Sequence, residues 1–215
     1  KMNAGLFFEA SCVGGVPIIR TLQEGMQANK ILSIKGIING TTNYILTKMF
    51  KGGASFEDSL LDAQERGYAE RNPAADVEGT DACRKICILA ALAFGRLYAP
   101  AAVHTEGITA VTAQNVADAE ALGGVIKLIG RAGRVDESDP DSDVFLLVSP
   151  HVVLHENPLS CVDDVFNAIL VRGNAVGDVM FYGRGAGRLP TASAVMADVL
   201  DIIRDCRKNI TWEEC

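Results

Sequence analysis

Short apolar runs and longer segments of helical period alternate along the first half of the chain. The apolar runs at residues 5–12 and 31–38 end at glycine or asparagine, a pattern typical of buried strands. The helical segments start beside residues that favour helix beginnings, namely Pro17, Asn39 and Ser55. Helices are therefore expected at residues 17–25, 42–50, 55–67 and 80–94. The last of these is apolar on nearly every side, which predicts a buried helix.

Strands become more frequent beyond Gly95. Runs rich in β-branched residues predict strands at residues 103–108, 125–132, 144–149, 165–171 and 176–182. Further helices are expected at residues 112–122 and 190–206, and a charged turn at residues 136–143. Strands and helices mix without regular alternation, so the pattern indicates an α/β fold in which a mixed β-sheet is flanked by helices.

Composition narrows the class of protein. Hydrophobic residues make up 48% of the chain and charged residues 22%, as in a soluble globular protein. A net charge of -7 and a pI near 5.0 argue against a nucleic-acid partner, which would need a basic face. No apolar run approaches the roughly 18 residues of a membrane span, and no signal segment opens the chain. We therefore expect a cytoplasmic enzyme or a part of one.

Neither the cysteines nor the histidines form a metal-binding motif. The six cysteines lie in apolar contexts without a zinc-ligand spacing, so reduced thiols are expected. His151 and His155 have a spacing that binds zinc on a helix, but Val152, Val153 and Pro158 favour strand and loop there. The cysteines are Cys12, Cys83, Cys87, Cys161, Cys206 and Cys215.

The richest candidate chemistry lies in residues 67–85, GYAERNPAADVEGTDACRK. Asp81 and Lys85 are four residues apart in an expected helix and share one of its faces. Glu70 and Asp76 lie in the preceding loop, where they can fold back over that face. A lysine among carboxylates can help bind an ammonium group and move a proton on a hydroxyl. The same residues also suit an exposed helix start with an ordinary surface ion pair.

Longer motifs in a fixed order favour the chemical interpretation. The chain also contains FEASCVGGVPII at residues 8–19, GIINGTTNYIL at 36–46, VFNAILV at 165–171 and FYGRGAGRLPTASA at 181–194. From about residue 5 to about residue 205 it closely resembles homoserine dehydrogenase. The resemblance implies that residues 1–210 form the catalytic domain of that family, which binds substrate and dimerises. Residues 211–215 are then expected to be a tail or a truncation point.

The resemblance also implies roles for the residues of the acidic loop and helix. Members of the family interconvert L-homoserine and L-aspartate 4-semialdehyde with NAD or NADP, in threonine and methionine biosynthesis. By this likeness Glu70 and Asp81 hold the substrate and Asp76 helps neutralise its ammonium group. Lys85 is the proton donor and acceptor at the hydroxyl. Two further residues, Gly40 and Thr41, border the substrate.

Glycines supply the expected cofactor contacts. By resemblance Gly67, Gly185 and Gly187 touch the nicotinamide cofactor, although a turn at the start of a helix would explain the last two as well. The glycine fingerprint of a dinucleotide-binding domain does not precede Glu9. A second lysine, which the family supplies from that domain, is also missing. We therefore expect a fragment that binds weakly and does not turn over by itself.

Glu9 belongs to an expected cation site. It ends an apolar run, where a carboxylate is costly unless paired, and a glycine-rich loop follows it. The resemblance implies a sodium ion held by Glu9 and by the backbone carbonyls of Cys12, Gly14 and Val16. The family usually has valine in place of Cys12, a harmless difference because only the carbonyl binds. The alternative is a structural carboxylate that accepts hydrogen bonds from backbone amides.

The partners follow from the same likeness. They are the substrate pair and a second copy of the chain, because family members dimerise through the sheet of this domain. One alternative is a non-catalytic module for dimerisation or amino-acid binding that reuses the fold. Another is the dehydrogenase part of a bifunctional aspartokinase, although Asn39-Gly-Thr-Thr-Asn looks more like the monofunctional type.

Overall fold

The computed structural model of the chain describes residues 5–139 and 142–204. The expected tail at 211–215, the end of the last predicted helix, Cys206 and Cys215 lie outside the described residues. The first half contains η1 (Glu9–Ser11), α1 (Ile18–Arg20), η2 (Thr21–Gly25), β1 (Ile31–Ile37), α2 (Gly40–Gly52), α3 (Phe56–Glu65), α4 (Ala74–Val77) and α5 (Thr80–Phe94). The second half contains η3 (Pro100–Ala102), β2 (His104–Thr105), α6 (Ala113–Ala121), β3 (Gly124–Arg134), β4 (Val144–Leu154), η4 (Pro158–Cys161), β5 (Phe166–Gly173), β6 (Gly177–Arg184) and α7 (Arg188–Ile203).

A six-stranded sheet in the order β2-β4-β3-β1-β5-β6 forms the centre of the molecule. Neighbouring strands are antiparallel except β2 and β4, which are parallel, so the sheet is mixed. The predicted fold class, a mixed sheet flanked by helices, is confirmed. The expected helices and strands also occur close to their predicted positions, with the differences given below.

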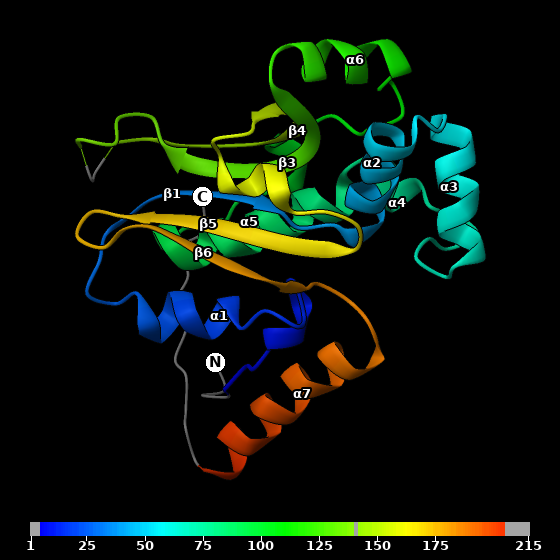
Figure 1. Cartoon of the computed structure of the whole chain (residues 1–215). Helices are drawn as coiled ribbons and strands as arrows, with labels where there is room; N and C mark the ends of the chain where they lie inside the picture. The colour runs from blue at the N-terminus through cyan, green and yellow to red at the C-terminus, as the bar shows by residue number, and fades with distance from the viewer. Residues whose placement is uncertain (1–4, 140–141, 205–215) are drawn as a thin grey trace.

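Helices α1, α5 and α7 lie on one face of this sheet, and α2, α3 and α6 lie towards one end of its strands (Figure 1). Alternate residues of the strands, such as Ile34, Leu128 and Ile169, point to that face and join the main hydrophobic core. Helix α5 supplies Ile86 and Leu89 to the same core, both fully buried. Its prediction as a buried helix is therefore confirmed, because an apolar surface on nearly every side needs cover from several neighbours.

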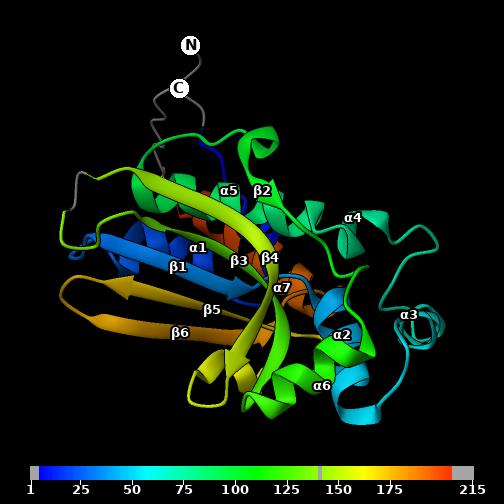
Figure 2. The same ribbon diagram turned by 90° about the horizontal axis from the view of Figure 1, so that it is seen from above.

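The opposite face of the sheet is covered only at one end. There, Leu159 and Val162 from η4 and the residue after it form a smaller core with Ile37 and Ile129. Figure 2 looks onto this face, with α1, α5 and α7 behind the strands. Away from η4, this bare face carries partly exposed side chains of the central and outer strands: Lys35, Arg131, Phe145, Leu147, Leu170, Arg172, Met180 and Tyr182.

The prediction of a strand at residues 5–12 was wrong. The segment forms no strand, and Glu9 begins the short helix η1 instead of ending a strand. Helices α1 and α7 pack against η1, where Cys12 is buried and Phe8 is partly buried, while Leu6 stays 63% exposed. Composition alone does not distinguish such a segment from a strand.

Two strands differ from their predicted lengths. Strand β2 keeps only His104 and Thr105, because the chain then leaves the sheet and Ile108 N–H donates to the Val77 carbonyl. Strand β4 continues through Pro150 to Leu154. Proline is tolerated there because β2 pairs with β4 only at Leu147 and Val148, so that edge of β4 is free. Among the described residues, no helix is long and apolar enough to cross a membrane.

Candidate active site

Asn39 joins three elements at the end of β1. Its side-chain oxygen accepts a hydrogen bond from Thr42 N–H at 2.9 Å and thereby caps α2, as predicted. Its side-chain nitrogen donates to Asp76 Oδ1 at 2.7 Å and to Asp81 Oδ2 at 2.9 Å. The side chain is 5% exposed, so these bonds are shielded from water. One amide therefore holds the acidic loop and the start of α5 against α2.

Lys85 completes this cluster. Its ammonium group lies 2.7 Å from Asp81 Oδ2 and donates to the Ile38 carbonyl at 3.2 Å. The side chains of Lys85 and Asp81 are 21% and 31% exposed, so the pair is partly shielded but reachable from solvent. The structure thus brings Asp76, Asp81 and Lys85 together, as the spacing of Asp81 and Lys85 on one helix predicted.

Thr41 lies at the start of α2, and Glu70 lies on the loop after α3. Thr41 Oγ1 donates to the Tyr68 carbonyl at 2.7 Å, which ties the loop to α2. Tyr68 also packs edge-on against Tyr44, with ring centroids 5.0 Å apart. Glu70 is exposed, and within the described part of the chain no ion pair joins its carboxylate to Lys85. The structure therefore leaves Glu70 free to face solvent or a ligand.

The predicted glycine turn lies between β6 and α7. Gly187 has φ +119° and ψ 153°, a conformation that side chains rarely adopt, and it directly precedes α7. Gly14 N–H donates to the Gly185 carbonyl at 2.8 Å, and Gly15 N–H to the Arg184 carbonyl at 3.0 Å. The loop of the expected cation site therefore contacts the expected cofactor turn. Gly67, with φ +74°, lies just after the end of α3.

The Glu9 carboxylate is buried at the start of α1. Its two oxygens accept hydrogen bonds from Ile19 N–H and Arg20 N–H, both at 2.9 Å. Burial raises the pKa of Glu9, while these amides and the charge of Arg20 oppose that effect. The bonds agree with the alternative of a structural carboxylate, but each oxygen keeps a second lone pair. Within the described residues, the Arg20 guanidinium pairs with Asp198 and Asp201, and no ion pair joins a cation to the Glu9 carboxylate.

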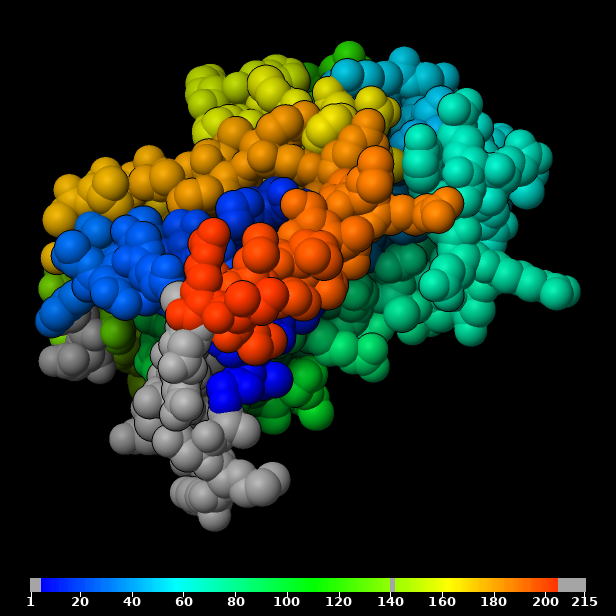
Figure 3. Space-filling view, turned by 90° about the horizontal axis from the view of Figure 1, so that it is seen from below, coloured from blue at the N-terminus to red at the C-terminus, as the bar shows by residue number. Residues whose placement is uncertain are grey.

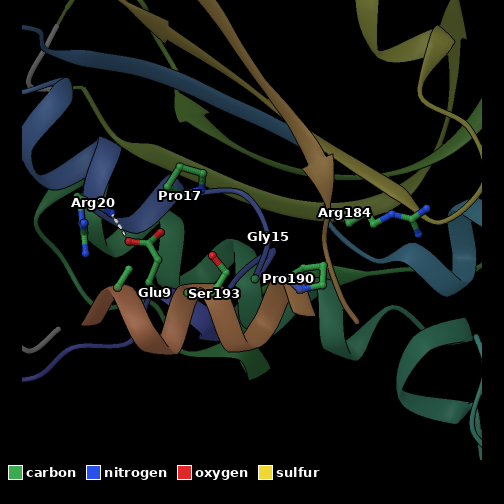
Figure 4. A pocket seen from close by; sticks show the side chains of 10 residues that line it. Glu9, Gly15, Pro17, Arg20, Arg184, Pro190 and Ser193 are labelled. Carbon is green, nitrogen blue, oxygen red and sulfur yellow. Dashed lines mark hydrogen bonds between the residues drawn. The ribbon is translucent and has the colours of Figure 1, made fainter. Parts of the chain in front are cut away.

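A cavity of about 340 Å³ lies beside Glu9, between its loop and α7. Glu9, Gly15, Pro17 and Ser193 line it, and Figure 4 shows the Glu9 and Ser193 side chains on the same space. Figure 3 shows α7 lying across the surface beside the N-terminal segment. The outward side of α7 is apolar and exposed, with Leu189, Val195, Met196, Val199, Leu200, Ile202 and Ile203.

Cys12 lies between the loop that follows Glu9 and helix α5. Its thiol points at the Lys85 carbonyl, 3.9 Å away, and the residue is fully buried. Burial raises the pKa of this thiol to about 11, so it stays protonated near neutral pH. Cys12 therefore acts as a packing residue beneath α5, and its side chain is not a candidate ligand.

Sequence reasoning missed the second role of Asn39. It identified the residue as a helix cap, which is correct, but did not foresee its bonds to Asp76 and Asp81. The signal was its chemical type, because serine or threonine caps as well but cannot donate through an amide nitrogen. His151, which had been considered as a zinc ligand, lies in β4, where its ring contacts the Ser149 carbonyl at 2.8 Å.

Comparison with known proteins connects the chain to one family. The model of the family described as homoserine dehydrogenase matches residues 17–200. Homoserine dehydrogenase of Bacillus subtilis is 43% identical over 206 residues, which are 96% of this chain and 46% of that protein. The enzyme of Helicobacter pylori is 48% identical over 202 residues, which are 94% of this chain and 47% of that protein. The chain thus spans about half the length of the curated relatives it matches.

Solved structures agree with the sequence comparison. A homoserine dehydrogenase from Thiobacillus denitrificans superposes with a TM-score of 0.87 and 41% identity, covering 96% of this chain and 51% of that one. A hyperthermophilic archaeal homoserine dehydrogenase mutant, solved in complex with NADPH, has a TM-score of 0.78 and 30% identity. That match covers 94% of this chain and 57% of the archaeal one.

Replacing Asn39 by aspartate tests the amide bridge. Aspartate still caps α2, but it would place a third carboxylate where Asn39 donates to Asp76 and Asp81. We expect Asn39→Asp to lower the free energy of unfolding at pH 7 by about 2 kcal/mol, the value of hydrogen bonds to charged groups. Urea unfolding at pH 7 measures the loss.

The matched control is Asn157→Asp, because Asn157 caps η4 through Leu159 N–H. We expect this variant to stay within about 0.5 kcal/mol of the parent, as for most surface substitutions. An equal loss in both variants would contradict the bridging role of Asn39.

Proposed function

This chain belongs to the homoserine dehydrogenase family, and we propose that the protein containing it interconverts L-homoserine and L-aspartate 4-semialdehyde. The observation that supports this most is the cluster of Asp76, Asp81 and Lys85 around Asn39. In this cluster an ammonium proton donor lies beside carboxylates, and the Lys85 and Asp81 side chains are partly exposed to solvent. An amino-alcohol substrate presents a matching ammonium and hydroxyl, and so fits this arrangement.

Lys85 is proposed to handle the hydroxyl proton. In oxidation a hydride leaves the hydroxyl-bearing carbon for the nicotinamide cofactor while the neutral amine of Lys85 takes up the O–H proton, so an aldehyde and the Lys85 ammonium form. In the reverse direction the Lys85 ammonium donates its proton to the oxygen of the carbonyl. Asp81 orients the ammonium through their 2.7 Å contact. Asp76, with the exposed Glu70, is proposed to face the substrate ammonium, and Gly40 and Thr41 to border the substrate.

A nicotinamide cofactor, NAD or NADP, would supply the hydride acceptor when bound. The β6–α7 turn fits such a group, because Gly185 and Gly187 keep side chains away from the start of α7, where helix N–H groups favour anions. Gly67 is proposed as a further contact. The matched structure solved with NADPH supports this choice. Binding of the rest of the cofactor, by a dinucleotide-binding domain, is assigned to other parts of the full-length protein, and α7 offers those parts an apolar surface.

A sodium ion is proposed beside Glu9. The residues fit a monovalent cation because a buried carboxylate, with no ion pair to another described residue, belongs to the same segment as the backbone carbonyls of Cys12, Gly14 and Val16. The loop is already set in an unusual conformation, with Val13 at φ +49°. A cation there would lock the loop that contacts both the Lys85 helix and the Gly185 turn. It would take no part in proton transfer.

The bare sheet face is proposed to pair with a second copy of the chain. It offers the apolar side chains of Phe145, Leu170 and Met180. Stable interfaces bury more than about 1,000 Å² in total, and an exposed sheet face can supply that area. We also propose a cytoplasmic location and a role in threonine and methionine biosynthesis, as the family implies.

The main alternative is a binding module that recognises the amino acid without converting it. Binding of homoserine without formation of NADH or NADPH would favour it. A kinase segment elsewhere in the full-length protein would instead favour a bifunctional aspartokinase. The cluster of Lys85 with Asp81 speaks for catalysis, because a binding module needs no proton donor there.

The Lys85 mechanism is tested in the full-length protein. Lys85→Ala should lower kcat by about 10²–10⁴, the usual contribution of one acid–base group. Asp81→Ala and Glu70→Ala should also raise KM for homoserine, because both are proposed to hold the substrate. Reduction of the cofactor followed at 340 nm measures the rates. Arg84→Ala, at the next and exposed position of α5, is the control and should keep kcat. A Lys85→Ala enzyme with normal kcat would eliminate the mechanism.

The cation site predicts a specific salt response. Sodium chloride should raise the thermal midpoint of the protein more than choline chloride at the same ionic strength, because a bound ion stabilises the folded state. Burial raises the pKa of Glu9, so protons compete with the ion and the effect should shrink at low pH. Glu9→Gln should lose it, while Glu57→Gln on exposed α3 should retain it. The same response in parent and Glu9→Gln would argue against the site.

Assembly through the sheet is tested at Met180, which lies on the bare face and is 39% exposed. Met180→Asp should convert a dimer into a monomer, because a charge would be buried at the interface. Leu61→Asp on α3, where the residue is 56% exposed, is the control and should leave the dimer intact. Light scattering at micromolar concentration gives the mass. A monomeric parent protein would refute the proposal.

A further inference from the structure

Lys127 is a fully buried cation on the far side of the sheet from the acidic cluster. It lies in β3, and its side chain is 2% exposed. The ammonium group donates to the Val162 carbonyl at 2.5 Å and to Asn43 Oδ1 at 3.2 Å, and lies 3.3 Å from Asp163 Oδ1. Burying a charge this completely is costly, and the mechanism above does not use it.

Asn43 lies between Lys127 and residues 162–166 and forms hydrogen bonds to both. With its oxygen turned to Lys127, its side-chain nitrogen donates to the carbonyls of Val162, Asp164 and Phe166, each at 3.0 Å. A flipped amide would place its NH₂ group against the ammonium, so Lys127 fixes the orientation that makes these bonds. Asp164 adopts φ +54°, so the segment is held in a conformation it would not otherwise prefer.

Residues 162–166 also contact the start of α2. A methyl group on Gly40 would lie 3.0 Å from the Val165 carbonyl, so the backbones are in close contact there. Gly40 follows Asn39, whose oxygen accepts from Thr42 N–H within the same turn. Residues 162–166 therefore contact Gly40, the neighbour of Asn39, whose amide bridges Asp76 and Asp81.

We propose that Lys127 is a positioning residue for the candidate active site, acting through Asn43 and the segment 162–166 on Gly40 and Asn39. The proposal rests on the function proposed above only for its kinetic consequences. Its structural part concerns this chain alone. Burial lowers the pKa of Lys127, with Asp163 opposing, and so the charge is held at a cost that a packing role would not need.

The first test is Lys127→Met in the full-length protein, which keeps most of the length of the side chain and removes its charge. We expect kcat/KM for homoserine to fall about tenfold, since small displacements of a site are costly, with KM for the cofactor unchanged. Lys51→Met is the matched control. Lys51 binds the other oxygen of Asp163 at 2.7 Å, but its side chain is 60% exposed. This control should stay within about twofold of the parent, as for a surface ion pair.

A second measurement separates positioning from general loss of structure. Amide hydrogen exchange at Thr42 should accelerate in Lys127→Met and not in Lys51→Met, because Thr42 N–H donates to Asn39. Asn115 N–H, which donates to the cap Thr112 of α6, is the internal reference and should change little. This readout needs no activity, so it decides the proposal even if the protein proves not to be a dehydrogenase.

A double-mutant cycle tests the route. In the Asn39→Ser background, Lys127→Met should change kcat/KM by less than about twofold, because the bridge it positions is already gone. A tenfold effect in both backgrounds would overturn the proposal, as would equal acceleration of exchange at Thr42 and Asn115. Where Lys127→Met does not fold, Asp163→Asn replaces it. Faster exchange at Thr42 in that variant supports the proposal, and unchanged exchange refutes it.

Discussion

The polarity of a single amide determines how the candidate site is built. Asn39 can accept only at its oxygen and donate only at its nitrogen, so capping α2 leaves the nitrogen facing the two carboxylates. This arrangement joins the end of a central strand, the first turn of one helix and the first turn of another. The bond from Asn39 also holds the Asp81 carboxylate in the position where it pairs with Lys85. Without the amide, the carboxylates would repel each other across a poorly solvated gap.

Much of the fold could be predicted because its signals are local. Caps at Asn39 and Ser55 and the glycines that follow their helices define α2 and α3 within a few residues. The segment at residues 5–12 was misinterpreted because an apolar run next to α1 and α7 has the same composition as a strand. Whether a partner strand is available depends on the whole topology, which no window of the sequence contains.

The candidate site was predictable to the extent that it lies within one segment. The spacing of Asp81 and Lys85 gave their pairing, since both belong to one helix. The bonds from Asn39 to Asp76 and Asp81 cross from one helix start to another segment and could not be read from spacing. The same limit applies to Lys127, whose surroundings come from α2 and from the turn before β5. The roles of Glu70 and of the glycines remain predictions from family likeness.

Helices α1, α5 and α7 lie on one side of the sheet, and this arrangement affects how ligands reach and leave the site. Stacked sheets lie about 10 Å apart, so two copies joined back to back would share a double-layered floor. Their reaction centres would open towards opposite sides of the particle. Each could then exchange ligands with bulk solvent without obstruction by its neighbour, and any influence between them would have to travel through the strands themselves.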